Sequence, residues 1–135
     1  MTAIMLNPSI ADERVLDNTL TRVQDFARRW GFGGMQIVNA FSAIATKPRD
    51  LRHMDLRSVE NDAHIKSAVA NASRIMLGWG SEMGSRDLSW RLPKMHALLK
   101  PAGPNIFAWK MTKDGHPSHP LYLRADIAPV PYSWT

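Results

Sequence analysis

Four short apolar segments, each followed by a polar or glycine-rich break, constrain the fold of this 135-residue chain more than any other feature. Runs that are apolar throughout, without alternation, are typical of strands buried on both faces of a sheet. Segments with helical periodicity lie between them, and this alternation predicts a largely parallel sheet with helices on both sides. We therefore expect an α/β domain with three layers, α/β/α, around a short and mainly parallel four-stranded sheet. The four expected strands are Ile4–Leu6, Met35–Val38, Arg74–Leu77 and Asn105–Trp109.

Three helices are expected between these strands. The first has its apolar positions at helical spacing, begins at a cap formed by Asp17 or Asn18, and ends at the glycines that follow Trp30. The second is expected from Ser58 to Asn71. The third leads to Leu99, and its Pro93 is tolerable only near a helix start. The apolar positions of the first helix are Leu20, Val23, Phe26, Ala27 and Trp30.

The remaining segments indicate one domain, residues 1–135, with an irregular tail from about residue 125. A chain of this length can bury a core without disulfides or metals. The stretch Asn39–Arg57 is expected to be a long loop, and long loops in compact domains are often functional.

Composition excludes several classes of protein. The chain has no cysteine, which excludes disulfides, thiol nucleophiles and thiolate metal sites. Its five histidines form no helical pair with an intervening glutamate, and no phosphate-binding glycine loop is present, so neither a metal nor a cofactor is expected. No apolar run is long enough to span a membrane and no signal peptide is visible, so we expect a soluble cytoplasmic protein that does not bind membranes. The oligomeric state is left open.

The charge favours a polyanionic partner. Lysine and arginine exceed aspartate and glutamate by 17 to 12. Residues 1–46 contain four bases and four acids, so the whole surplus lies in residues 47–135. A basic surface favours nucleic acid or nucleotides through counterion release. A surplus of five is also common among soluble domains that bind no polyanion.

The breaks after the strands are the candidate site. The carboxyl ends of parallel strands lie at one edge of a sheet, where open α/β folds bind ligands. The residues expected there are Asn7, Pro8, Ser9, Asn39, Phe41, Gly78, Gly80, His116, Ser118 and His119. For several of them a structural role is the simpler explanation, because Asn7 and Asn39 can start turns, the glycines can permit tight ones and Phe41 can belong to the core.

Two resemblances bear on these segments. The runs Met5–Asp12, Trp30–Gly34 and Lys113–Leu123 resemble a bacterial and phage family of uncharacterised proteins, over nearly the whole chain. More distantly, four blocks are similar in content and order to the uracil-DNA glycosylase superfamily. They are the Asn-Pro at residues 7–8, the strand that ends in Asn39, the Gly-Trp-Gly-Ser at 78–81 and the His-Pro-Ser at 116–118.

The glycosylase resemblance implies roles for individual residues. Asn7 would orient the attacking water, and Asn39 would bind the edge of a pyrimidine. His116 would donate a hydrogen bond to the base oxygen that gains charge as the glycosidic bond breaks. Pro117 and Ser118 would shape the loop against phosphates, although His119 could equally be the working imidazole.

The sequence departs from the glycosylase pattern at the stacking aromatic, for which Phe41 or Phe32 would have to substitute. From the strand-end site and the resemblance together, the expected function is recognition of a nucleobase, in nucleic acid or in a nucleotide, with hydrolysis of its N-glycosidic bond. The alternative is a non-catalytic nucleic-acid-binding or protein-interaction module on the same fold.

Overall fold

The computed structural model describes residues 1–6, 13–41 and 57–133, and for residues 13–17 and 57–60 it describes the backbone alone. The strands are β1 (Thr2–Met5), β2 (Gln36–Asn39), β3 (Ile75–Leu77), β4 (Ile106–Ala108) and β5 (Val130–Pro131). The α-helices are α1 (Glu13–Arg29), α2 (Arg57–Ala70) and α3 (Leu92–Leu99), and the 3-10 helices are η2 (Ser81–Gly84), η3 (Ser89–Arg91) and η4 (Lys100–Asn105).

The sheet has the order β2-β1-β3-β4-β5. The first four strands are parallel, and β5 is antiparallel to β4. From β1 the chain crosses to β2 on one side, and it then returns to place β3 on the other side of β1. The order of the strands therefore reverses between β1 and β3, and such a reversal opens a crevice at the carboxyl ends of the two strands.

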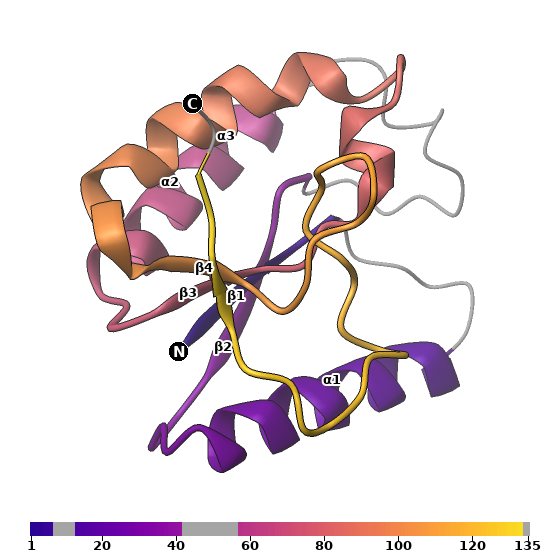
Figure 1. Ribbon diagram of the computed structural model, residues 1–135. Helices are drawn as coiled ribbons and strands as arrows, with labels where there is room; N and C mark the ends of the chain where they lie inside the picture. The colour runs from indigo at the N-terminus through magenta and orange to yellow at the C-terminus, as the bar shows by residue number, and fades with distance from the viewer. Residues whose placement is uncertain (7–12, 42–56, 134–135) are drawn as a thin grey trace.

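Helices cover both faces of the sheet, as the alternation predicted (Figure 1). On one face α1 packs through Val23, Phe26 and Ala27. On the other face α2 and α3 bury residues such as Ile65 and Met95. All residues of β1 and β3 are buried, because each strand lies in the middle of the sheet with helices above and below it.

A buried charge holds the end of β2. Arg91 is 2% exposed, pairs with Asp62 of α2 and donates from Nε to the carbonyl oxygen of Ala40 at 2.9 Å. Asn61 donates its side-chain amide to the carbonyl oxygen of Asn39 at 2.8 Å. The backbone that leaves β2 is thus fixed by side chains from two helices.

The expectation of four strands is wrong, because the sheet has a fifth. Val130 and Pro131 pair with Ala108 and Phe107, in the tail that we expected to be irregular. Pro131 lacks an amide hydrogen, but an edge strand tolerates proline because only one of its sides is paired. The amide of Tyr132 extends the pairing by donating to the carbonyl of Ile106 at 3.1 Å.

Two helix expectations also need correction. The first helix begins at Glu13 rather than at a cap on Asp17 or Asn18. Glu, Arg and Leu are good helix formers, so the polar stretch at its start extends the helix. The third helical region is divided into η2, η3 and α3, and Pro93 lies in the first turn of α3 where its missing amide hydrogen costs nothing.

Candidate functional site

A cleft of about 500 Å³ lies where the strand order reverses. Its walls come from the end of β1, from the turn that follows β3 and from the loop that follows β4. The described residues that line it are Met5, Leu6, Trp79, Gly80, Ser81, Glu82, Thr112, Ser118 and His119. Three distant parts of the sequence thus meet at one edge of the sheet, as expected for the ends of parallel strands.

The loop after β4 is closed by its own hydrogen bonds. Thr112 accepts from the amide of His116 through its side-chain oxygen at 3.0 Å, and its own amide donates to the carbonyl of His116 at 2.7 Å. The amide of Ser118 donates to the carbonyl of Lys110 at 2.8 Å. Gly115 has a φ of 81°, a conformation that glycine adopts readily, and this allows the tight turn at the tip. The loop therefore presents its lining residues on a fixed backbone.

The loop is attached to the turn after β3 at two glycines. The amide of Gly80 donates to the carbonyl of Pro117 at 2.8 Å. A Cβ on Gly78 would lie 3.1 Å from side-chain atoms of Met5, Pro120 and Trp109, so only glycine fits there without displacing them. Of these two predicted residues, Gly80 lines the cleft, whereas Gly78 is packed beneath it.

His116 lies against Gly84 and is not among the residues that line the cleft. A Cβ on Gly84 would overlap the imidazole of His116 at Nε2 and Cε1. The ring therefore packs directly on the backbone of η2, which also contains the lining residue Glu82. The sequence placed His116 at the correct edge of the sheet, but it contained no sign that a glycine 32 positions earlier receives the ring.

His119 is the histidine in the wall of the cleft. Its Nδ1 accepts a hydrogen bond from the amide of Leu121 at 3.2 Å. Desolvation by the surrounding protein lowers the pKa of His119, although the residue as a whole keeps much of its surface in water. The ring is thus neutral at pH 7, and because Nδ1 is an acceptor, Nε2 carries the proton and can act as a donor.

Glu82 is the one carboxylate among the described lining residues, and the sequence pattern did not single it out. It is exposed and forms no ion pair with another described residue. Its signal in the sequence was a carboxylate two residues after a strand-end glycine, Gly80. The described parts of the chain contain no group of three histidine or acidic side chains that could hold a metal ion.

The other predicted site residues have different surroundings. Asn7, Pro8 and Ser9 lie outside the described residues, directly after the lining residue Leu6. Asn39 is half-buried and does not line the cleft. Phe41 is 4% exposed and packs edge-to-face against Trp90 at a centroid separation of 5.6 Å, within the core.

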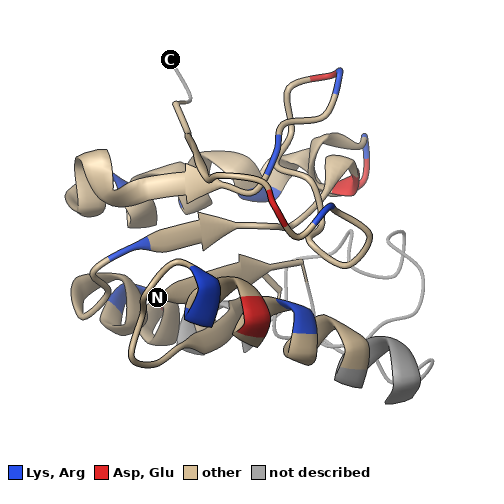
Figure 2. Ribbon diagram, turned by 60° about the horizontal axis from the view of Figure 1, so that its bottom comes forward, with Lys and Arg blue, Asp and Glu red and all other residues tan. Residues whose placement is uncertain are grey.

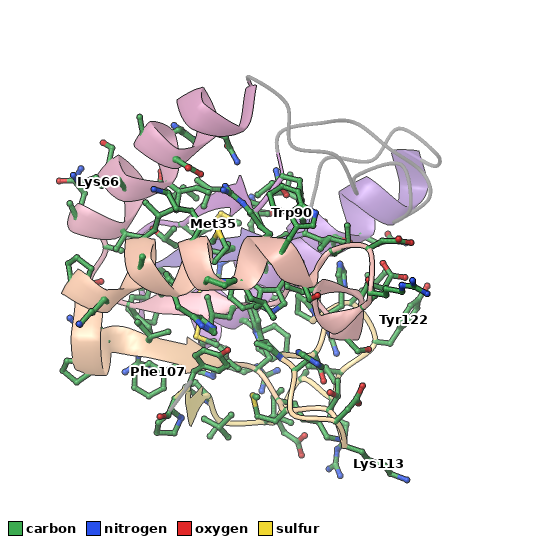
Figure 3. All side chains as sticks on the ribbon, turned by 90° about the horizontal axis from the view of Figure 1, so that it is seen from above. Met35, Lys66, Trp90, Phe107, Lys113 and Tyr122 are labelled. Atoms are coloured by element: carbon green, nitrogen blue, oxygen red, sulfur yellow. The ribbon has the colours of Figure 1, made fainter. Side chains whose placement is uncertain are left out.

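The structure describes only some of the lysines and arginines that make up the basic surplus. Residues 42–56, which contain Lys47, Arg49 and Arg52 from the basic part of the chain, lie outside the described residues. Lys113 extends into solvent at the tip of the loop after β4 (Figure 3). Arg124 forms a bidentate pair with Asp126, at 3.1 and 2.7 Å.

In the described parts of the chain, no helix has the length and the apolar character that a membrane-spanning helix needs.

Comparison with known families finds an uncharacterised family. The model of a family described as "Protein of unknown function (DUF1643)" matches residues 1–121. The chain belongs to the DUF1643 family. The region shared with this family includes β1 to β4 and all the described residues that line the cleft. Comparisons with curated proteins and with solved structures found no match.

Proposed function

We propose that the cleft binds a nucleobase, in nucleic acid or in a nucleotide, and that the protein hydrolyses its N-glycosidic bond. The observation that carries the proposal is the position of the cleft at the reversal of strand order between β1 and β3. Open α/β sheets bind ligands there, and about 500 Å³ is within the usual range for a small-molecule site. The four sequence blocks that resemble uracil-DNA glycosylases support the choice of a nucleobase.

The lining residues supply the groups that such a reaction needs. A water oxygen forms a bond to C1′ of the sugar as the C1′–N bond breaks, and the bonding electron pair leaves with the base. The proton of the water passes to the carboxylate of Glu82, which acts as general base. The Nε2–H of His119 donates to the base oxygen on which negative charge develops. The released base anion then takes a proton from solvent, and Glu82 gives its proton back to solvent, which restores the carboxylate.

His116 has a different role in this proposal from the one that the resemblance implies. Its ring packs on Gly84 of η2, so it holds the turn that carries Glu82 and acts as a positioning residue. Asn7 follows Leu6 in the chain, and orientation of the attacking water remains the role that the resemblance gives it.

The proposal is tested by base release. Oligonucleotides that contain uracil, hypoxanthine or xanthine, and the corresponding free nucleosides, are incubated with the protein, and free base is quantified by chromatography. We expect Glu82→Gln and His119→Gln each to lower turnover by about 100-fold or more, with a much smaller change in affinity. Asp114→Asn and His64→Gln are matched controls, because both residues are exposed and neither lines the cleft.

Two outcomes would overturn parts of the proposal. If the unmodified protein releases no base from the whole panel but binds the substrates, the hydrolase proposal fails and the non-catalytic binding module takes its place. If His116→Ala lowers turnover as much as His119→Gln while Glu82→Gln has no effect, the roles assigned here to His119 and Glu82 are wrong.

A further inference from the structure

A second hollow of about 500 Å³ lies beside α1, away from the cleft residues. One wall is α1, and the other is the strap, by which we mean residues 119–127 that run from the cleft across α1 (Figures 1 and 2). The residues that line this groove are Arg22, Asp25, Phe26, Arg28, Arg29 and Ala125. Among the described residues that line it, three guanidinium groups face one carboxylate, so this part of the groove is positively charged.

Arg22 anchors the strap. Its Nη2 donates to the carbonyl oxygen of Leu123, and its guanidinium lies over the ring of Phe26 at 5.2 Å. Because the guanidinium is held by this hydrogen bond and by the contact with the ring, it cannot turn freely into solvent. Arg22 therefore fixes the distance between the strap and α1, and it adds a stationary positive charge to the groove.

Arg28 and Arg29 are available to a ligand. Arg28 is paired with Asp25 at 3.7 Å, but the two side chains are 81% and 56% exposed. An ion pair that is this exposed contributes little to stability. Arg29 is exposed and has no carboxylate partner among the described residues. Basic residues in a last turn stabilise the helix dipole, but that role accounts for neither the groove nor the anchored Arg22.

The strap joins the groove to the cleft. His119 lines the cleft and Ala125 lines the groove, so only five residues lie between them and the chain can span at most about 22 Å. Between them Tyr122 is 90% exposed and its side chain points away from the body of the protein (Figure 3). An exposed aromatic beside a basic groove is the combination that binds single-stranded nucleic acid, in which bases stack on rings and phosphates meet cations.

We propose that the groove binds the backbone phosphates of a single nucleic-acid strand through Arg28 and Arg29, and that the strand follows the strap to place a base in the cleft. The inference rests on the proposed function, because it assigns the nucleobase of the cleft to a polymer rather than to a free nucleotide. Tyr122 stacks on a base between the two hollows.

The test is fluorescence anisotropy with two labelled strands of about ten nucleotides, one of oligothymidylate and one with the same phosphodiester backbone but no bases, at 50 and 200 mM salt. We expect Arg28→Gln/Arg29→Gln to weaken binding of both strands at least about fivefold. The slope of the logarithm of the binding constant against the logarithm of the salt concentration should become shallower by about one for each phosphate that the variant no longer binds. The matched control is Lys66→Gln/Lys94→Gln, which removes two exposed charges from the opposite face. We expect Tyr122→Ala to weaken binding of oligothymidylate alone.

The outcomes separate the groove from the cleft. Equal affinities in the arginine variant and the unmodified protein would overturn the proposal that the groove binds phosphates. An equal loss of affinity in the lysine control and the arginine variant would overturn it as well. Inorganic pyrophosphate that binds as tightly as the base-free strand would show a small-anion site and overturn the strand proposal. If no base is released but the base-free strand still depends on the arginines, the groove is supported and the hydrolase proposal fails.

Discussion

Replacement of Gly84 by alanine tests the packing of His116 on η2. Gly84 has no positive φ, so alanine fits its backbone, and the substitution restricts the unfolded chain by an amount worth about 0.4–1 kcal/mol. Against this gain, the new methyl group overlaps the imidazole of His116. Overpacking typically costs about 1–3 kcal/mol, and because a histidine ring can rotate away, we expect the lower end of that range. After this gain is subtracted, Gly84→Ala should lower the free energy of unfolding by up to about 0.6 kcal/mol, and the protein should be about 1 kcal/mol less stable than it would be if alanine met no overlap.

The assay is urea denaturation followed by tryptophan fluorescence, with Gly33→Ala as the matched control. Gly33 also has no positive φ, and a Cβ there meets no atom within 4 Å, so alanine at position 33 should be neutral or slightly stabilising. In a His116→Ala background the overlap is absent, and Gly84→Ala should then stabilise by about 0.4–1 kcal/mol. The same loss of stability in both backgrounds would refute the contact between His116 and Gly84.

Three further predictions concern other parts of the fold. Asp62→Ala should lower the free energy of unfolding by about 3 kcal/mol in urea denaturation, because it leaves the buried charge of Arg91 unpaired, and a loss as small as that of Asp126→Ala would contradict this. Gly78→Ala should cost about 1–3 kcal/mol in the same assay, since it crowds three side chains, and an unchanged denaturation midpoint would refute the close packing. The NMR titration of His119 should show a pKa below about 6.5, and a midpoint above 6.5 would contradict the desolvation. The contribution of His119 to the free energy of unfolding should be complete above about pH 6.5 and be lost as the pH falls through the folded pKa.

The sequence predicted the strands that are buried on both faces. β3 and β4 are continuous apolar runs, and β1 is one after Thr2, although it begins two residues before the expected Ile4. Such runs are typical of strands with helices on both faces of the sheet. β5 was not predictable in this way, because two residues that include a proline carry no strand pattern. It exists because β4 offers a free edge, which is a property of the assembled sheet.

The candidate site was predictable to the level of segments but not of side chains. Gly80, Ser118 and His119 line the cleft because strand ends meet at one edge, and that rule needs only the strand assignments. Whether His116 or His119 faces the cleft depends on the ring of His116 packing on Gly84. No local pattern reports a contact across 32 residues. For the same reason Glu82 was overlooked, because its place in the wall follows from the turn after β3.

The strap and β5 have a consequence for the boundaries of the family. The family match ends at residue 121, whereas Leu123 and Ile127 pack against the core beneath α1, and Tyr132 packs against the core on the opposite side of the sheet. The segment shared with the family therefore leaves hydrophobic surface on both faces of this sheet, which the last residues of the chain cover. In this protein the residues that the family model matches are fewer than the residues that complete the fold.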